Sequence, residues 1–271
     1  MSLSLKHLYL IIQFELKRLF ASRKGLLSLV TLLAVWGLIL LYPIRLAAKF
    51  VLQTGQDQSN AFTNFLGLGS LIKWPIIEFQ VYWQIAIILL PLLSIAIAAD
   101  QTSSDRKRGT LRFLTLRTTR DNIFFGRFLS VSFIQLLIIL FTLITTLGLT
   151  LYRDASLITL AFTTATTILL NLVIILLPYN ALMALLSAKL NSARQAIMWA
   201  ILIMIVLSAI ISKLSTYAPI LELLQLFILG FYNADIAKVS GLIPLELAAL
   251  PLIQTVVFLA IGRWIMVSKS L

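Results

Sequence analysis

The sequence predicts an all-α polytopic membrane protein with six transmembrane helices, and two observations support this fold class. Hydrophobic residues make up 60% of the 271-residue chain and charged residues only 12%, whereas about a quarter of the residues in a soluble domain are charged. Six apolar stretches have about the length that crosses the hydrocarbon core of a bilayer, roughly 20 residues. The six expected spans are residues 25–42, 80–99, 128–152, 157–187, 195–211 and 245–267.

Lysine and arginine are distributed unevenly between the two sets of segments that connect these spans. Sixteen of the 22 lie in residues 1–24, in the loop 100–127, at Lys189 and Arg194, or in the C-terminal tail; the other six lie in the alternate loops, where six acidic residues offset them. Because positively charged loops stay on the cytoplasmic side during insertion, we expect the first set and both termini to be cytoplasmic. The long fourth stretch predicts a kink at Pro178 or an extension beyond the membrane.

Residues 1–24 predict a cytoplasmic amphipathic helix that precedes the six-span domain, residues 25–271. Apolar residues recur at spacings of three and four from Leu5 to Leu19, while lysines and a glutamine fall on another face. Such a helix lies flat in the headgroup region of the inner leaflet. A solvated basic flank that only orients the first span is an equally good interpretation of the same pattern.

The expected outer loops contain two unusual segments. In the first, Trp74 and the nearby Tyr82 and Trp83 match the aromatic belt of a membrane interface. The second, residues 212–244, includes PILELLQLFILGF, an apolar run of about a dozen residues that is too short to cross a bilayer. Because neighbouring helices must satisfy the backbone of such a run, we expect a re-entrant or interfacial segment there.

The sequence contains no motif for catalysis, metal binding or nucleotide binding. Cysteine is absent and His7 is the single histidine, which excludes disulfides and thiolate or imidazole metal clusters. The G-x-x-x-x-G-K-[ST] phosphate loop is absent, so we expect no ATPase activity and no cofactor in this chain. The net charge of +12 has the topological origin described above, and nucleic acid is not an expected partner.

Few polar groups lie inside the expected spans. A carrier coupled to protons or ions is expected to place ionisable groups near the membrane midplane. The acidic residues of this chain lie outside the expected spans or near their ends, except Glu246, which lies beside the start of the last span. Intramembrane amides more often join helices than bind substrate. The substrate-binding residues therefore stay unknown at this stage. The amides are Gln135, Asn171, Asn180 and Gln254.

The loop 100–127 is the one long charged segment and holds seven of the 22 lysines and arginines. Its segment DRKRGTLRFL (105–114), followed by Arg120 and the pair Gly126-Arg127, resembles a pattern found after the second span in permease subunits of ABC-2 type ATP-binding-cassette exporters. That pattern is an acid, a basic residue, Gly-Thr-Leu, an apolar pair, then Arg and Gly-Lys. Lys107 departs from it, because the family often has an acid there.

Two other regions resemble the same family. The N-terminal segment FELKRLFASRKG, with Glu15, Lys17 and Arg18, is similar to the opening of these subunits, and so is the expected outer hairpin before the last span. A second departure is that the usual proline before the Ser-Arg pair is replaced in the segment LRTTR, residues 116–120.

The resemblance implies a permease that moves an unidentified substrate by alternating access, driven by separate ATPase subunits. It implies two ATPase copies, which hold ATP and Mg²⁺, and a homodimer or a heterodimer with a related permease. The sequence has no N-x-[ST] glycosylation sequon, which agrees with a location in the inner membrane of a bacterial cell. Two alternatives stay open. One is a secondary carrier driven by an ion gradient, and the other is a non-transporting membrane scaffold or assembly factor.

The resemblance also implies a cytoplasmic coupling helix in this loop, between the second and third spans. Gly109 and Thr110 can start a short helix with Thr110 as its cap, and the apolar residues that follow can enter a cleft on the ATPase. Alternatively, the arginines only orient the spans and the apolar side chains lie on lipid. The expected ATPase-coupling residues are Gly109, Thr110, Leu111, Arg112, Phe113, Leu114, Arg117 and Arg120; those of the interfacial helix are Glu15, Lys17 and Arg18.

Overall fold

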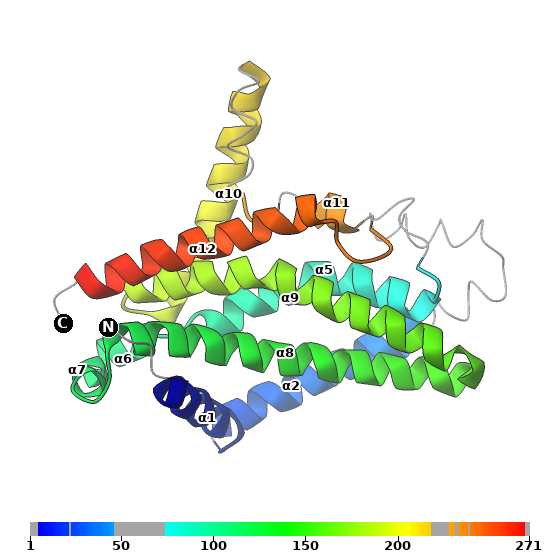
Figure 1. Ribbon diagram of the computed structural model, residues 1–271, viewed down its shortest axis with the longest axis horizontal. Helices are drawn as coiled ribbons and strands as arrows, with labels where there is room; N and C mark the ends of the chain where they lie inside the picture. The colour runs from blue at the N-terminus through cyan, green and yellow to red at the C-terminus, as the bar shows by residue number, and fades with distance from the viewer. Residues whose placement is uncertain are drawn as a thin grey trace.

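All regular secondary structure in the described residues of the computed structural model is helical, and the predicted all-α class is confirmed (Figure 1). The described residues are 5–21, 23–45, 74–217, 228–230, 233–237 and 239–268. The elements are α1 (Leu5–Ala21), α2 (Arg23–Ile39), its π-helical continuation η1 (Leu40–Ile44), α5 (Ile77–Ala98), α6 (Ser103–Lys107), α7 (Thr110–Thr115), α8 (Arg120–Arg153), the 3-10 turn η2 (Ala155–Leu157), α9 (Ile158–Lys189), α10 (Ala193–Tyr217), α11 (Asn233–Ala237) and α12 (Leu245–Ser268).

Five of the described helices are long and apolar enough to cross a membrane: α5, α8, α9, α10 and α12. The first expected span corresponds to α2 and η1, whose apolar part, Val30–Ile44, is shorter. A layout with six crossings therefore stays a prediction. α8 begins at Arg120, eight residues before the expected start, because a helix continues beyond its apolar part when its first turn is capped.

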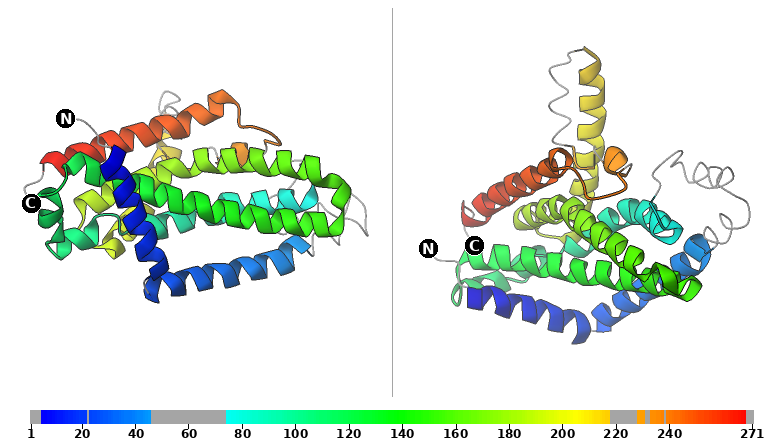
Figure 2. Two further views of the ribbon diagram at one scale, coloured as in Figure 1. Left: turned by 60° about the horizontal axis from the view of Figure 1, so that its bottom comes forward. Right: turned by 45° about the vertical axis from the view of Figure 1, so that its right-hand side comes forward.

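α9 lies at the centre of the bundle and packs against α12, α8 and α5 (Figure 1). It is one continuous helix of 32 residues that includes Pro178. At 1.5 Å per residue, a helix of this length measures about 48 Å, which exceeds the roughly 30 Å of a hydrocarbon core. α10 projects away from the other helices (Figures 1 and 2).

The aromatic residues expected in an interfacial belt lie instead in the protein core. Trp74, Tyr82 and Trp83 are all buried, and the Tyr82 hydroxyl forms a 3.0 Å hydrogen bond with the Thr142 hydroxyl. The indole N–H of Trp83 donates to the carbonyl of Ala237 at 3.2 Å. The aromatic-belt prediction is therefore wrong for these three residues, because each ring packs against other helices of the bundle.

Amides inside the bundle join neighbouring helices. The Gln135 amide of α8 donates to the Ser94 hydroxyl of α5, and the Asn180 amide of α9 donates to the Gln135 carbonyl oxygen. Nearer the N-terminal end of α9, the Asn171 amide donates to the carbonyl of Gly241 at 2.7 Å. These contacts agree with the interpretation that intramembrane amides connect helices.

The segment before α12 reaches into the bundle. The Asn233 amide donates to the Tyr179 hydroxyl at 3.1 Å, and Ile236 is buried. Tyr179 precedes the C-terminal end of α9 by ten residues, about 15 Å of helix. The re-entrant segment nevertheless stays a prediction, because residues 218–227, which carry most of its apolar run, lie outside the described residues.

Candidate functional site

The loop between α5 and α8 folds into two short helices, α6 and α7, at the end of the bundle where α12 ends (Figure 1). Gly109 joins them with a φ of +71°, a left-handed conformation that residues with a Cβ adopt at a cost. Gly109 occupies the N-cap position of α7 and offers no side-chain cap.

The sequence predicted that Thr110 caps α7. In the structure Thr110 is instead the first residue of that helix. Its hydroxyl instead donates to Asp105 of α6, whose carbonyl oxygen lies at 3.2 Å and whose Oδ1 lies at 3.1 Å. Thr110 therefore fastens α7 back onto α6, which fixes the angle between the two short helices.

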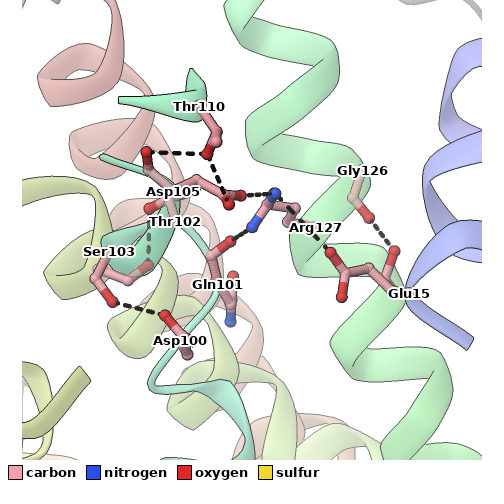
Figure 3. Close-up of polar contacts among 11 residues, drawn as sticks. Glu15, Asp100, Gln101, Thr102, Ser103, Asp105, Thr110, Gly126 and Arg127 are labelled. Carbon is pink, nitrogen blue, oxygen red and sulfur yellow. Dashed lines mark hydrogen bonds and ion pairs between the residues drawn. The ribbon is translucent and has the colours of Figure 1, made fainter. Parts of the chain in front are cut away.

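The buried guanidinium of Arg127 in α8 contacts both the loop and α1 (Figure 3). One of its nitrogens donates to the carbonyl of Gln101, just after α5, and the other donates to the Asp105 carboxylate. Glu15 of α1 lies 3.9 Å from the second nitrogen. A planar guanidinium suits this arrangement because it donates in several fixed directions and stays charged when buried.

Two more arginines of the loop bind the C-terminal ends of transmembrane helices. Arg106 donates to the carbonyl of Ala188 in α9, and Arg120 donates to the carbonyls of Met266 and Val267 in α12, at 3.3 and 2.9 Å. The last carbonyls of a helix lack partners within it and lie at the negative end of its dipole, so cations are favourable there. Burial lowers the pKa of Arg106, but an arginine stays protonated at neutral pH.

The apolar residues of α7 that were expected to enter the ATPase cleft lie on two different faces of the helix. Leu111 is only 1% exposed and packs in a core with Phe124, Phe128 and Met266, whereas Phe113 is 71% exposed. A helix turns 100° per residue, so positions two apart lie about 200° apart on opposite sides. Leu111 therefore holds α7 against the bundle, and Phe113, Leu114 and the following Leu116, which is 82% exposed, form the outward face.

The arginines that were expected to contact the ATPase also lie in two different places. Arg112 and Arg117 are exposed beside the outward face, whereas Arg120 lies against the end of α12. In the interfacial helix, Glu15 faces Arg127 and Lys17 is exposed; the side chain of Arg18 lies outside the described residues.

Sequence reasoning missed three contributors to this site: Asp105, Arg127 and Leu116. Arg127 carried a signal, because it is a lone cation beside an expected span and so needs a partner. Leu116 carried a weaker signal, as it follows Phe113 by three residues, a spacing that keeps two helical residues on neighbouring positions.

Among the described residues, no group of three or more His, Cys, Asp and Glu residues is placed to bind a metal ion.

The family comparison covers this site except for its residues in α1. The sequence model of the ABC-2 family transporter proteins matches residues 20–266, which include α2 to α11, nearly all of α12 and every residue of the 100–127 loop. No curated protein matches the chain. Because this match extends over almost the entire sequence, and the fold is a bundle of apolar helices, the chain belongs to the ABC-2 family of transporter proteins.

Proposed function

We propose that the chain is the permease subunit of an ABC exporter, which moves its substrate by alternating access as separate ATPase subunits bind and hydrolyse ATP. Members of this family are the transmembrane components of transporters, and the ATPase activity lies in separate subunits. The observation that carries the proposal is the outward face of α7: Phe113, Leu114 and Leu116 are exposed on a helix that the bundle holds firmly.

The outward face of α7 has the chemistry of a docking surface. Exposed apolar side chains clustered in a cytoplasmic loop favour a partner that covers them, here a cleft on the ATPase. Lys107, Arg108, Arg112 and Arg117 are exposed around this face. We infer that the ATPase cleft is apolar inside and acidic at its rim, since complementary charge orients the encounter.

The arrangement around this contact follows from the same proposal. Two copies of the permease, identical or related, act with two ATPase subunits that hold ATP and Mg²⁺. The chain crosses the inner membrane of a bacterial cell six times, and both termini are cytoplasmic. α1 lies at the inner membrane surface, where its exposed Tyr9, Leu10 and Phe14 contact lipid and the exposed Lys17 reaches the headgroups.

A paired variant tests the docking surface. The chain carrying Phe113→Asp and Leu116→Asp is coexpressed with an ABC ATPase that copurifies with the parent chain, and the amount of copurified ATPase is measured. Loss of most of the bound ATPase is expected, because two carboxylates are buried without partners at the contact. Tyr152→Asp, at an 89% exposed position on the far end of α8, is the matched control and should retain the ATPase.

Three results would refute the proposed function. The first is normal insertion of the doubly substituted chain with undiminished ATPase binding. The second is uphill transport by vesicles that contain only this chain and an ion gradient, as a secondary carrier requires. The third is a stable complex in which no tested compound stimulates ATP hydrolysis, as expected of a scaffold or assembly factor.

A further inference from the structure

We propose that Glu78 and Arg153 are positioning residues for transport, which hold the outer ends of α5 and α8 together so that both helices move with α7 as one rigid hairpin. The role in transport rests on the proposed function, whereas the rigidity of the hairpin does not. α5 runs towards the cytoplasmic loop and α8 runs away from it, so the two helices are antiparallel and α6 and α7 lie at their shared cytoplasmic end.

Polar contacts join α5 and α8 at four levels. From the outer end inwards, the first is the ion pair between Arg153 Nε and Glu78 Oε1 at 2.8 Å. The second is the Tyr82 to Thr142 hydrogen bond at 3.0 Å. The third is the hydrogen bond from Gln135 to Ser94, and the last is that from Arg127 to the carbonyl of Gln101.

The register of these contacts shows that they follow one antiparallel seam. From the outermost contact to the innermost, the residue number rises by 23 on the α5 side, from Glu78 to Gln101, and falls by 26 on the α8 side, from Arg153 to Arg127. At 1.5 Å per residue the interval in α8 is about 39 Å, and the helical part on the other side, from Glu78 to Ala98 at the end of α5, is about 30 Å. The contacts therefore hold the pair along its whole length.

The outermost contact is unusual because Glu78 is fully buried, at 1% exposure. Its Oε1 pairs with Arg153, and within the described part of the chain its Oε2 has no hydrogen-bond partner. Hydrophobic residues of similar volume often replace such a pair without loss of stability, so stability alone does not account for it. Holding two helix ends in a fixed register is the role that the geometry supports.

The pair also matches the electric field of both helices. Glu78 lies in the first turn of α5 and Arg153 is the last residue of α8. An acid near a helix N-terminus and a base near a helix C-terminus are each favourable. A rigid hairpin held in this way carries a displacement of α7 to the outer end of the bundle, where an opening for export is needed.

Distance measurements by electron paramagnetic resonance test the hairpin in the chain alone. The sequence has no cysteine, so paired cysteine substitutions are labelled uniquely. Labels at Ile88 and Tyr152, which are 53% and 89% exposed, report across the hairpin. Labels at Leu129, which is 41% exposed, and at Tyr152 report along α8 only and serve as the control pair.

In lipid nanodiscs we expect one narrow distance between Ile88 and Tyr152 in the parent chain. Glu78→Gln and Arg153→Gln should each abolish the narrow distribution, Arg153→Lys should preserve it, and the control pair should not change in any variant. If a single substitution prevents folding, the double variant Glu78→Gln/Arg153→Gln, which leaves no unpaired charge, replaces it. A narrow, unshifted distance in Glu78→Gln, or in this double variant, would overturn the proposal.

A second measurement tests the role in transport. Labels at Tyr152 and at Leu245, the exposed first residue of α12, report the outer ends during ATP hydrolysis by the bound ATPase. ATP is expected to shift this distance in the parent chain, and Glu78→Gln should lose the shift while it retains the ATPase. An undiminished shift in Glu78→Gln contradicts the positioning role. Failure of the parent chain to bind any ATPase contradicts the proposed function instead, and the Ile88 to Tyr152 result still decides whether the hairpin is rigid.

Discussion

At the scale of single residues, the candidate coupling site depends on groups that have no close substitute. Gly109 adopts a φ of +71° between α6 and α7, where an added Cβ would meet no atom within 4 Å. Its importance is therefore conformational rather than steric. A residue with a Cβ costs about 1–2 kcal/mol in this left-handed region, and a β-branched residue more.

We therefore expect Gly109→Val to loosen the junction between α6 and α7 and to reduce the amount of ATPase that copurifies with the chain. The matched control is Gly148→Ala, because Gly148 lies inside α8 with equally open space around it and without a positive φ. Alanine in a helix interior is favourable, so the control should retain the ATPase and melt at the same or a higher temperature. Equal ATPase binding by Gly109→Val and the parent chain would contradict this expectation.

A second prediction concerns the contribution of the Arg127 guanidinium to stability. Its position between the Gln101 carbonyl and the Asp105 carboxylate uses two nitrogens at once. An ammonium cannot reproduce this fork, so Arg127→Lys should lower the melting temperature measured in detergent, whereas Arg117→Lys, on an exposed side chain, should not. A double-mutant cycle with Asp105→Ala and Arg127→Ala should give a coupling energy of about 1–3 kcal/mol. Simple additivity of the two substitutions would show that the pair contributes no interaction of its own.

At the scale of helices, the long elements were predictable and the orientation of the short ones was not. The expected spans correspond to α5, α8, α9, α10 and α12 within several residues, because length and apolar composition decide whether a helix can lie in a bilayer. α7 has six residues, which is under two turns and too short for a periodic pattern to show which side is buried. Leu111 and Phe113 are both apolar, and only the core formed by α8, α9 and α12 distinguishes them.

The polar contacts of the site were unpredictable for a related reason. Asp105 and Arg127 are separated by 22 residues, and Arg120 and Met266 by 146. Neither spacing follows from a helical repeat, because these contacts depend on how α8, α9 and α12 pack side by side. The sequence indicated that the loop was charged, but not that three of its arginines face inwards.

The contact between α1 and α8 provides a prediction at this scale. A Cβ on Gly126 would lie 2.8 Å from Cδ1 and 3.3 Å from Cβ of Ile11, so a larger residue pushes on the α1 side chain along its whole length. Gly126→Leu should therefore separate α1 from α8. In a chain with a single cysteine at the neighbouring, partly buried Ile12, which leaves Ile11 in place, a water-soluble thiol reagent should react faster after this substitution. Gly148→Leu is the control, and an equal reaction rate in the two variants would contradict the proposed close packing.

At the scale of the whole molecule, the loop arginines form two groups with different tasks. Arg106, Arg120 and Arg127 point into the protein and bind the ends of α9 and α12 and the segment after α5. Arg112 and Arg117 are exposed around the outward face of α7. The inner group connects the loop to the bundle, and in the proposed function the outer group faces the ATPase.

This division predicts opposite phenotypes for two matched double variants. Arg112→Gln/Arg117→Gln should weaken ATPase binding and reduce its dependence on salt, because exposed charges act through a screened field, while the melting temperature of the permease stays unchanged. Arg106→Gln/Arg120→Gln should lower the melting temperature, since carbonyls at two helix ends lose their cations, and should leave α7 able to bind the ATPase. In that second complex ATP hydrolysis should continue, but the ATP-dependent distance change between Tyr152 and Leu245 should be lost. Identical effects of the two variants on binding, melting and distance would show that the arginines act as one group, and that α7 is not connected to α9 and α12 through Arg106 and Arg120.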